Sequence, residues 1–442
     1  MNNKAHLHHI VVIGGGAGGL ELATQLGDKL GKSKKANIML VDCNLTHLWK
    51  PLLHEVAAGS LNSHEDELSY MAQGHWHHFI FLLGRMDRLD QKNKEISLAP
   101  TVDEHGVEYI PRRIFSYDTL IIAVGSVTND FNIPGIQEHC LFLDTQQQAD
   151  HFHKILLRNY YAAHTQKEPL REGQLHIAIA GAGATGVELS AELYEATRQV
   201  VEFGLDRIIP EDVKITIIEG SDRILPALPE RLSKLTEKAL HNINIQICTG
   251  QRITKATAEG FHTHSGQFIP AEIKVWAAGV KAPDFLKGLD GLETNTINQL
   301  IVKPTLQTTL DDNIFAMGDC AACPMPDSGN TVPPRAQAAQ QQASMLVKTI
   351  QRRLRNEPLP EYHYVDYGSL INISQYSTVG NLMGNLMGKL SGNFMIEGVF
   401  ARLVYLSLYK MHQLALHGFV RVAFSTLANI LTRKVKPRMK LH

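Results

Sequence analysis

Two glycine-rich stretches have the residue types and the spacing to bind the phosphates of a dinucleotide. Each places three glycines directly after a short apolar run: Gly14, Gly16 and Gly19 in the first stretch, and Gly181, Gly183 and Gly186 in the second. At this spacing the first glycine makes a tight turn from a strand into a helix, the second lets the backbone approach a pyrophosphate, and the third lets the helix pack closely on the strand. A helical pattern over residues 21–30 follows the first stretch, and its N-terminus then faces the phosphates. Ala17, within the first glycine stretch, belongs to the same predicted site.

An acidic residue follows the second predicted strand after each glycine stretch. Asp42 closes the strand at residues 37–41, and Glu219 closes the strand at residues 213–218. A carboxylate at this position can accept hydrogen bonds from both ribose hydroxyls of an adenosine. Asp42 lies 28 residues after the first glycine, beyond the usual spacing of about 20, so a surface-turn residue is the alternative interpretation. Glu219 should prefer NADH because its carboxylate would repel a 2′-phosphate, although the nearby Arg223 leaves NADPH use open.

Both parts of the chain continue in the same order, with a small antiparallel insert and then a strand that ends in small residues. The first insert is predicted as a hairpin of residues 94–98 and 107–110, and the closing strands run over residues 117–125 and 272–279. Backbone can pass close to a cofactor at the small residues that end these strands: Ala123, Gly125, Ala278 and Gly279. A supersecondary order that occurs twice is a much stronger signal than either glycine stretch alone.

A late strand over residues 313–319 ends in Gly-Asp and brings no third glycine stretch. We expect it to return to the first sheet, which makes the second unit an insertion into the first. The predicted fold class is therefore α/β, with two Rossmann-like dinucleotide-binding domains, the second inserted in the first. The predicted boundaries are residues 1–144 and 297–383 for the first domain, 145–296 for the second, and 384–442 for a C-terminal region.

Composition and charge exclude some classes of protein. A net charge of −1 over 442 residues argues against a nucleic-acid binder that depends on phosphate contacts. The five cysteines are odd in number and scattered, which suits a reducing compartment better than a disulfide framework. The first strand begins within about ten residues of Met1, so no apolar leader is expected, and no metal site is expected either.

Three further groups have both a chemical and a structural interpretation. Lys50 could place a cation near a reduced flavin and favour its anionic form, or it could be an exposed lysine before a proline turn. Cys320 and Cys323 have the spacing of a redox pair, but a buried, unreactive pair is favoured. Gln337 and Gln341 share one face of a predicted helix, where two amides can bond the carbonyl oxygens of a flat quinone. A solvated, glutamine-rich helix is the alternative.

The chain resembles the type II NADH dehydrogenases, which are the single-subunit NADH:quinone oxidoreductases of respiratory membranes. These belong to the flavoproteins with two dinucleotide-binding domains. The resemblance extends over nearly the whole chain and rests on an Ala-Gln-x-x-x-Gln motif at residues 336–341 and on five further segments: Gly-Gly-Gly-Ala-Gly-Gly (14–19), Trp-Lys-Pro-Leu-Leu-His-Glu-Val-Ala (49–57), Gly-Ala-Thr-Gly-Val-Glu-Leu (183–189), Val-Trp-Ala-Ala-Gly-Val-Lys-Ala-Pro-Asp-Phe-Leu (275–286) and Pro-Arg-Met-Lys-Leu-His (437–442).

The resemblance implies that the first domain holds FAD and that the second binds NADH as a substrate. It places Asp319 at the ribityl or pyrophosphate region of FAD, and Glu188 at the contact of nicotinamide and flavin. It also implies that Gln337 and Gln341 line the site of a membrane quinone such as ubiquinone. The implied activity is hydride transfer from NADH to FAD and two-electron reduction of the quinone, without proton pumping.

Two other functions remain open at this point. A sulfide:quinone oxidoreductase would need catalytic cysteines beside the flavin and no intact nicotinamide-binding stretch. A protein of a different class would be a membrane-docked flavoprotein that binds partners, with NADH as a regulator. Steady NADH-dependent reduction of a quinone separates both from the predicted enzyme.

The C-terminal region is expected to associate with a membrane without crossing it. Residues 394–431 are apolar but contain Arg402, Lys410 and Arg421, which makes a transmembrane helix unfavourable. Polar residues recur there every four positions, as in an amphipathic helix that lies in the membrane surface: Gln413, His417, Arg421, Ser425 and Asn429. Five cations that attract anionic lipid follow: Arg433, Lys434, Lys436, Arg438 and Lys440. We expect a peripheral protein on the cytoplasmic face of the bacterial inner membrane; the alternative is a helix packed on the domain or in a homodimer.

Overall fold

The computed structural model describes residues 7–62, 67–103, 105–205, 207–326, 329–373, 377–383, 393–397, 422–424 and 426. The chain divides by its internal contacts into two compact units. The first comprises Met1–Trp49, Asp66–Val127 and Val280–Asp366, and the second comprises Lys50–Glu65, Thr128–Gly279 and Tyr367–His442. The predicted domain boundaries are defined by the cofactor that each part is expected to hold, and they stay a prediction.

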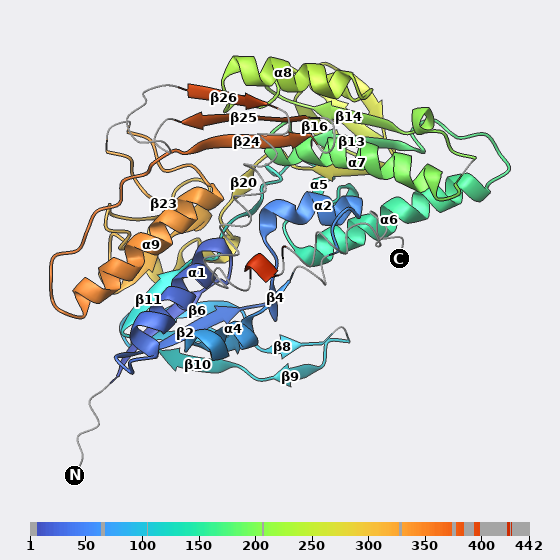
Figure 1. The fold of residues 1–442 in the computed structure, drawn as a ribbon. Helices are drawn as coiled ribbons and strands as arrows, with labels where there is room; N and C mark the ends of the chain where they lie inside the picture. The colour runs from blue at the N-terminus through green and yellow to red at the C-terminus, as the bar shows by residue number, and fades with distance from the viewer. Residues whose placement is uncertain are drawn as a thin grey trace, which may run out of the picture. The chain divides into compact units, whose positions relative to one another are not determined.

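A parallel five-stranded sheet of order β22-β11-β1-β2-β5 forms the centre of the first unit (Figure 1). Its strands are β1 (His8–Ile13), β2 (Ala36–Asp42), β5 (Ile80–Leu83), β11 (Thr119–Ile122) and β22 (Ile314–Ala316). The inner strands are nearly continuous apolar runs, which is typical of parallel strands that are covered on both faces. β22 pairs in parallel with β11, which confirms that the late strand returns to the first sheet.

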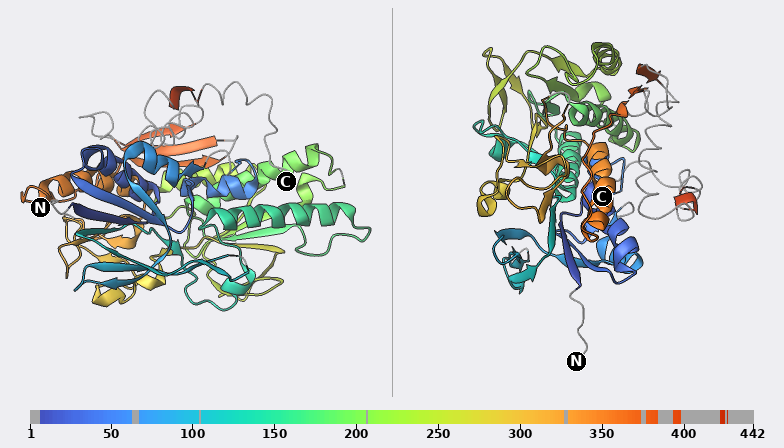
Figure 2. Two further views of the ribbon diagram at one scale, coloured as in Figure 1. Left: turned by 90° about the horizontal axis from the view of Figure 1, so that it is seen from below. Right: turned by 90° about the vertical axis from the view of Figure 1, so that its left-hand side faces the viewer.

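Three helices accompany this sheet. α1 (Ala17–Leu26) follows β1 and packs against α9 (Ala336–Arg353), as Figures 1 and 2 show. α4 (Tyr70–His77) also contacts α1 and leads into β5. Just before α4, β4 (Leu68–Ser69) pairs with β3 (Thr46–His47).

The antiparallel insert of the first unit differs in pairing from the predicted hairpin. β7 (Glu95–Leu98) lies between β6 (Met86–Asp90) and β10 (Arg113–Ser116), because these strands let it bury Ile96 and Leu98. The hairpin forms instead between two shorter strands, β8 (Thr101–Val102) and β9 (Glu108–Ile110). The predicted pairing of residues 94–98 with 107–110 is therefore wrong.

The second unit repeats the plan of the first. Its parallel sheet has the order β15-β14-β13-β19 and contains β13 (His176–Ala180), β14 (Lys214–Ile218), β15 (Gln246–Cys248) and β19 (Ile273–Trp276). β13 lies between β14 and β19 as β1 lies between β2 and β11. Its antiparallel insert contains β16 (Ile253–Ala256), β17 (Gly260–Thr263) and β18 (Phe268–Pro270). The predicted duplication and the α/β class with parallel sheets are confirmed.

The helices of the second unit bring together residues that are far apart in the chain (Figure 1). α2 (Leu53–Ala58) packs against both α6 (Gln146–Thr165) and α7 (Ala184–Glu202). The described part of this unit also contains α8 (Glu230–His241) and the single turn α5 (Ile136–His139). The remaining short elements are η1 (Gly27–Gly31), η2 (Lys50–Leu52), β12 (Val127–Thr128), η3 (Pro210–Asp212), β20 (Val280–Lys281), η4 (Asp284–Leu286), η5 (Leu289–Gly291), β21 (Leu300–Ile301), η6 (Gly318–Cys320) and β23 (Ala321–Ala322).

A further antiparallel sheet was not predicted from the sequence. It consists of β24 (Gly368–Ile373), β25 (Ser377–Met383) and β26 (Asn393–Glu397), and it packs against α7 and α8. The predicted amphipathic helix lies outside the described residues, apart from 422–424 and 426. Among the helices that are described, none has the length and apolar character to cross a membrane.

Candidate functional site

The first glycine turn joins β1 to α1, and each of its three glycines has a separate steric role. Gly14 has a φ of +100°, and a Cβ there would collide with the backbone carbonyl of Ala123. A Cβ at Gly19 would meet the carbonyl oxygen of Gly14, so the helix can approach the turn only because this residue is glycine. Gly16 differs, because among the described residues no atom beyond its own chain neighbours lies within 4 Å of the position that its Cβ would take.

The second turn, between β13 and α7, has the same geometry. Gly181 has a φ of +99°, and its Cβ would collide with the carbonyl of Ala277. Gly186 stands against the carbonyl oxygen of Gly181, and Gly183 faces open space as Gly16 does. The structural equivalent of Ala123 is therefore Ala277, one residue before the predicted Ala278.

Both turns fit the phosphates of a dinucleotide. Gly16 and Gly183 are the N-cap residues of α1 and α7, and neither helix has a side-chain hydrogen bond at its cap. The N–H groups of a first helical turn need acceptors from outside the helix. A diphosphate that approaches the open face of the N-cap glycine supplies such acceptors, and the helix dipole favours its charge.

The two strand-end carboxylates bind the glycine turns directly. Asp42 accepts hydrogen bonds from the Gly15 N–H at Oδ2 (2.7 Å) and from the Asn44 N–H at Oδ1 (2.8 Å). Glu219 repeats this with the N–H groups of Ala182 and Ser221, both at 2.8 Å. Oδ1 of Asp42 also accepts a hydrogen bond from the Asn44 side-chain amide (3.1 Å). Each carboxylate oxygen has two lone pairs, so Oδ2 of Asp42 and both oxygens of Glu219 can each accept one further bond, from a ribose hydroxyl. Both acids therefore also hold the turns, a role that the sequence pattern did not indicate.

Asp319 is placed by η6, directly after β22. Its Oδ2 accepts a hydrogen bond from the Ser126 hydroxyl (2.7 Å), and its carbonyl accepts one from the Gln299 amide (2.9 Å). Gly125, next to Ser126, has a φ of +70° and faces open space. Ser126 and Gln299 carry no spacing signal in the sequence, although Ser126 follows the predicted Gly125 directly.

Two predicted residues of the second unit have close protein partners. The Lys50 ammonium lies 3.4 Å from Asp144 Oδ1, and the side chain is 45% exposed. Asp144 also accepts hydrogen bonds from the N–H and the hydroxyl of Thr128. A Cβ at Gly279 would touch the ring of Phe131. Lys50 thus forms an ion pair with Asp144, a partner that no pattern in the sequence indicated.

Glu188 lies on α7 inside a buried polar cluster. Its Oε1 accepts a hydrogen bond from the backbone N–H of Asn372 on β24 (3.0 Å), and its Oε2 lies 4.0 Å from Nδ1 of His54 on α2. Loss of solvent on burial raises the pKa of Glu188 to about 8, and the Asn372 bond opposes this while the nearby Glu192 adds to it. Burial lowers the pKa of His54 to about 4. At neutral pH the cluster therefore holds a protonated carboxyl beside a neutral imidazole.

Gln337 and Gln341 both lie on α9, and their amides are hydrogen-bonded to the segment that precedes β24. Gln341 donates to the carbonyl of Val365 (2.8 Å) and accepts from the N–H of the same residue (3.0 Å). Gln337 donates to Oδ1 of Asp366 (3.2 Å), whose other oxygen pairs with Arg335 (3.1 Å). Both amides therefore form hydrogen bonds to protein groups, whereas a solvated helix would present them to water.

The cysteine pair that follows Asp319 has no reactive thiolate. Cys320 and Cys323 are free and buried, and burial raises the pKa of Cys320 to about 11 and that of Cys323 to about 12. This agrees with the unreactive interpretation. Within the described part of the chain, no group of three or more His, Cys, Asp or Glu side chains is placed to hold a metal.

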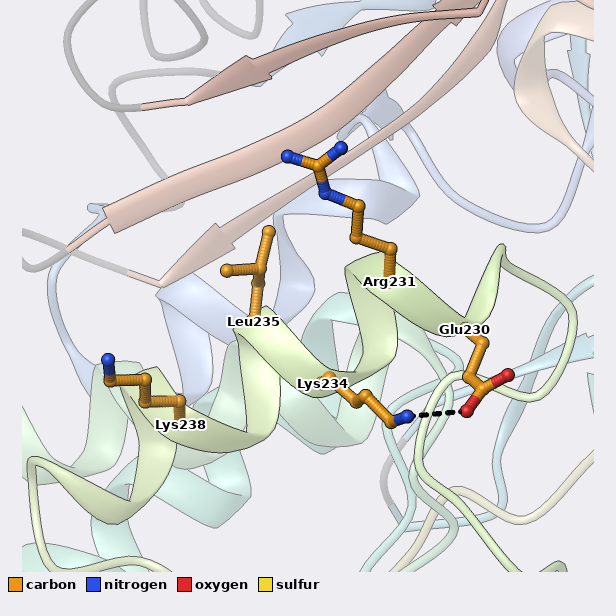
Figure 3. Close-up of a pocket in the computed structure, with 5 residues that line it drawn as sticks. All are labelled: Glu230, Arg231, Lys234, Leu235 and Lys238. Carbon is orange, nitrogen blue, oxygen red and sulfur yellow. Dashed lines mark ion pairs between the residues drawn. The ribbon is translucent and has the colours of Figure 1, made fainter.

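A charged surface on α8 is separate in character from the glycine turns. Figure 3 shows that Arg231, Leu235 and Lys238 extend from one side of this helix, where Arg231 and Lys238 are exposed and Leu235 is half-buried. Lys234 pairs with Glu230 at 2.7 Å. The five residues of this surface all come from α8, and the ion pair of Lys234 and Glu230 is largely exposed. Such a surface lacks the convergent buried polar groups of a cofactor site.

Residues 8–343 match the family of pyridine nucleotide-disulphide oxidoreductases. The chain is 43% identical over 448 aligned positions to a type II NADH:quinone oxidoreductase of Haemophilus influenzae, with 99% of this chain and 100% of that protein covered. It is 27% identical to a type II NADH:quinone oxidoreductase of Staphylococcus aureus, over 90% of this chain and 95% of that protein.

Solved structures share the fold at lower sequence identity. NDH2 of Plasmodium falciparum, determined in complex with NADH, superposes with a TM-score of 0.83 at 21% identity, covering 98% of this chain and all of that chain. The sulfide:quinone oxidoreductase of Aquifex aeolicus superposes with a TM-score of 0.69 at 18% identity, covering 97% of this chain and 96% of that chain.

Proposed function

This chain belongs to the type II NADH:quinone oxidoreductases, within the pyridine nucleotide-disulphide oxidoreductase family, and from that premise we propose how its residues perform the reaction. The reaction is the oxidation of NADH by a quinone through bound FAD, without proton pumping. The observation that carries this function is the pair of matched glycine turns, because one protein then binds two dinucleotides, a resident FAD and a substrate NADH.

The two turns are assigned to different dinucleotides. We assign FAD to the turn of Gly14, Gly16 and Gly19, because the returning strand β22 brings Asp319 into the same unit. The turn of Gly181, Gly183 and Gly186 is then left for NADH. FAD supplies the two-electron chemistry that connects a hydride donor to a quinone, and the protein binds and orients the reactants.

The surroundings of Glu219 support a preference for NADH over NADPH. Both oxygens of Glu219 accept backbone hydrogen bonds, so the carboxylate is held at the strand end where a 2′-phosphate would meet it. Arg223 donates to the carbonyls of Leu228 (2.9 Å) and Pro226 (2.7 Å). Because these bonds hold the guanidinium in its own loop, Arg223 is a poor anchor for a 2′-phosphate.

Three residues are proposed to act on the substrates. Glu188 holds a proton at Oε2, since its Oε1 already accepts the Asn372 N–H. A quinone that gains two electrons also takes up two protons; the hydride of NADH accounts for one, and the proton of Glu188 is available as the other. Gln337 and Gln341 are assigned to the quinone side by their motif. The Gln341 amide forms two hydrogen bonds with the backbone of Val365, so it also orders the segment at residues 362–366.

An anaerobic titration tests the proposed function. NADH added to the purified yellow protein should bleach the flavin absorbance, and a soluble quinone added afterwards should restore it. Steady turnover should require both substrates, and NADPH should bleach the flavin poorly because of Glu219. Absence of bleaching by NADH in protein that contains FAD would contradict the assignment, as would bleached flavin that quinone does not reoxidise.

We propose that the C-terminal region binds the cytoplasmic face of the bacterial inner membrane through its basic residues. Changing Arg433, Lys434, Lys436, Arg438 and Lys440 to glutamine should weaken binding to vesicles that contain anionic lipid at least about hundredfold, since each cation contributes about 1 kcal/mol. Co-sedimentation with anionic and neutral vesicles measures this. Substitution is preferable to deletion of residues 394–442, because deletion would remove β26 from its sheet.

A matched control neutralises three cations elsewhere on the surface. Changing Arg231, Lys234 and Lys238 of α8 to glutamine should leave vesicle binding nearly unchanged (Figure 3). The control removes three cations and the test variant five, so the same loss per cation removed would mean that net charge alone governs binding. That result would refute the membrane assignment of the C-terminal region. A homodimer stays a prediction.

A further inference from the structure

We propose that Tyr70 and His47 are positioning residues for the resident dinucleotide, because they hold the carbonyl of Gly15 and thereby aim the phosphate-binding N–H of the first glycine turn. This inference rests on the proposed assignment of FAD to that turn. It gives a role to a glycine and to two buried side chains that the dinucleotide-binding spacing does not use.

Two buried side chains converge on the carbonyl oxygen of Gly15. The Tyr70 hydroxyl donates to it at 2.8 Å, and Nδ1 of His47 lies 3.0 Å away. A carbonyl only accepts, so His47 carries a proton on Nδ1. Tyr70 is 3% exposed and His47 is 4% exposed. Burial also lowers the pKa of His47 to about 4, so the imidazole donates as a neutral group at physiological pH.

The fold fixes both side chains before any ligand arrives. His47 ends β3, and Tyr70 begins α4 directly after β4, which pairs with β3. The ring of Tyr70 stacks on Phe81 of β5, with centroids 5.1 Å apart. The backbone N–H of Tyr70 donates to the carbonyl of Leu45 (3.1 Å). The two donors therefore come from rigid elements rather than from a loop.

Gly15 is glycine because Tyr70 occupies the space beside it. A Cβ on Gly15 would lie about 2.5 Å from the Tyr70 ring and hydroxyl, closer than real side-chain atoms approach. The equivalent residue of the second turn is Ala182, which carries a Cβ, and its carbonyl accepts the backbone N–H of Leu225 (2.8 Å). The carbonyl of Gly15 is thus held by two side chains, and that of Ala182 by a backbone group of a loop.

The geometry of the peptide bond transmits this hold to the phosphate site. In a trans peptide the C=O and the following N–H point in opposite directions. Holding the Gly15 carbonyl toward Tyr70 and His47 therefore turns the Gly16 N–H the other way. Asp42 holds the preceding peptide through the Gly15 N–H. With both peptides held, the turn does not have to reorder on binding, which strengthens binding by lowering its entropy cost.

The difference between the two turns matches the difference between a resident and a visiting dinucleotide. The second turn relies on Leu225, a non-glycine residue with a φ of +47° in a loop without regular structure. A turn whose carbonyl is held by a backbone group of a loop suits a substrate that must leave in every cycle. A turn fixed by buried side chains suits a cofactor that stays bound.

The experiment measures FAD binding to the full-length protein by flavin fluorescence, as a dissociation rate and as a Kd after removal and return of FAD. Tyr70→Phe keeps the ring and removes one donor, so FAD should bind about three- to tenfold more weakly. His47→Leu should act similarly, and the double variant should bind about hundredfold more weakly. His47→Asn keeps a donor near the position of Nδ1 and should restore most of the affinity.

Two controls separate positioning from general damage. Tyr160→Phe removes another buried hydroxyl, which bonds Thr197 at 2.7 Å in the second unit, and should leave FAD affinity unchanged. Binding of NADH, followed by its own fluorescence, should be unchanged in all variants at position 70 or 47. If the double variant does not fold, the FAD affinities of the two single variants and of His47→Asn are compared with that of the wild type instead.

The outcomes of this test are distinct. Wild-type FAD affinity in Tyr70→Phe and His47→Leu would overturn the positioning role. Equal loss in Tyr160→Phe would also overturn it, since the effect would then follow from any lost buried hydroxyl. Wild-type protein that binds no FAD would instead refute the proposed function itself.

Discussion

Replacing Gly183 by alanine should abolish NADH-driven bleaching of the flavin at ordinary NADH concentrations, while the protein keeps its fold and its FAD. In the part of the chain that the structure describes, no atom beyond the neighbouring residues lies within 4 Å of the new Cβ. Gly183 also has a φ of −72°, which alanine adopts freely. The methyl group would occupy the space through which the pyrophosphate reaches the N-terminus of α7. Loss of two charge-assisted hydrogen bonds should raise the KM for NADH at least about hundredfold.

The matched variant is Gly16→Ala in the first turn. Its new Cβ also meets open space, so the protein should fold but be purified without FAD. Thermal unfolding of the two proteins without ligand should match that of the wild type. A Gly183→Ala protein with wild-type KM for NADH, or a Gly16→Ala protein that retains FAD, would show that the dinucleotides do not approach these glycines.

Replacing Glu188 by glutamine should remove a pH dependence from both stability and turnover. The folded pKa of about 8 lies above the ordinary value of 4.5, so the folded state keeps a proton that the unfolded state loses. Stability of the wild type should therefore fall as pH rises from about 4.5 to 8, by a total on the order of 3 to 5 kcal/mol. Glutamine stays neutral, so Glu188→Gln should become the more stable protein above neutral pH.

The same substitution should slow quinone reduction and change its pH profile. Wild-type kcat should fall above about pH 8 as Glu188 loses its proton, and Glu188→Gln should turn over at least about tenfold more slowly with no such fall. Glu202→Gln, at the exposed end of the same helix, should match the wild type in both measurements. A Glu188→Gln protein with the wild-type pH profile would exclude Glu188 as the proton-holding group.

The dinucleotide turns could be predicted because their requirements are local. A left-handed φ at Gly14 and Gly181, and close contact at Gly19 and Gly186, need glycine at fixed spacing. The apolar runs that end in these turns likewise predict parallel strands, and the repeated order predicts two units. The antiparallel pairing within residues 94–110 was predicted wrongly, because short strands pair according to the partners that bury them.

By itself, the sequence determined the two units, their glycine turns, the acids at the strand ends and the return of β22. Only the tertiary structure decided which groups complete the sites: Tyr70 and His47 on the Gly15 carbonyl, Asn372 and His54 beside Glu188, and Val365 on Gln341. The sheet of β24, β25 and β26 was likewise decided by the tertiary structure, since no pattern in the sequence predicted it. Such contacts join residues that are distant in the chain, and they have no spacing or period because packing and burial, rather than local backbone geometry, choose the partners.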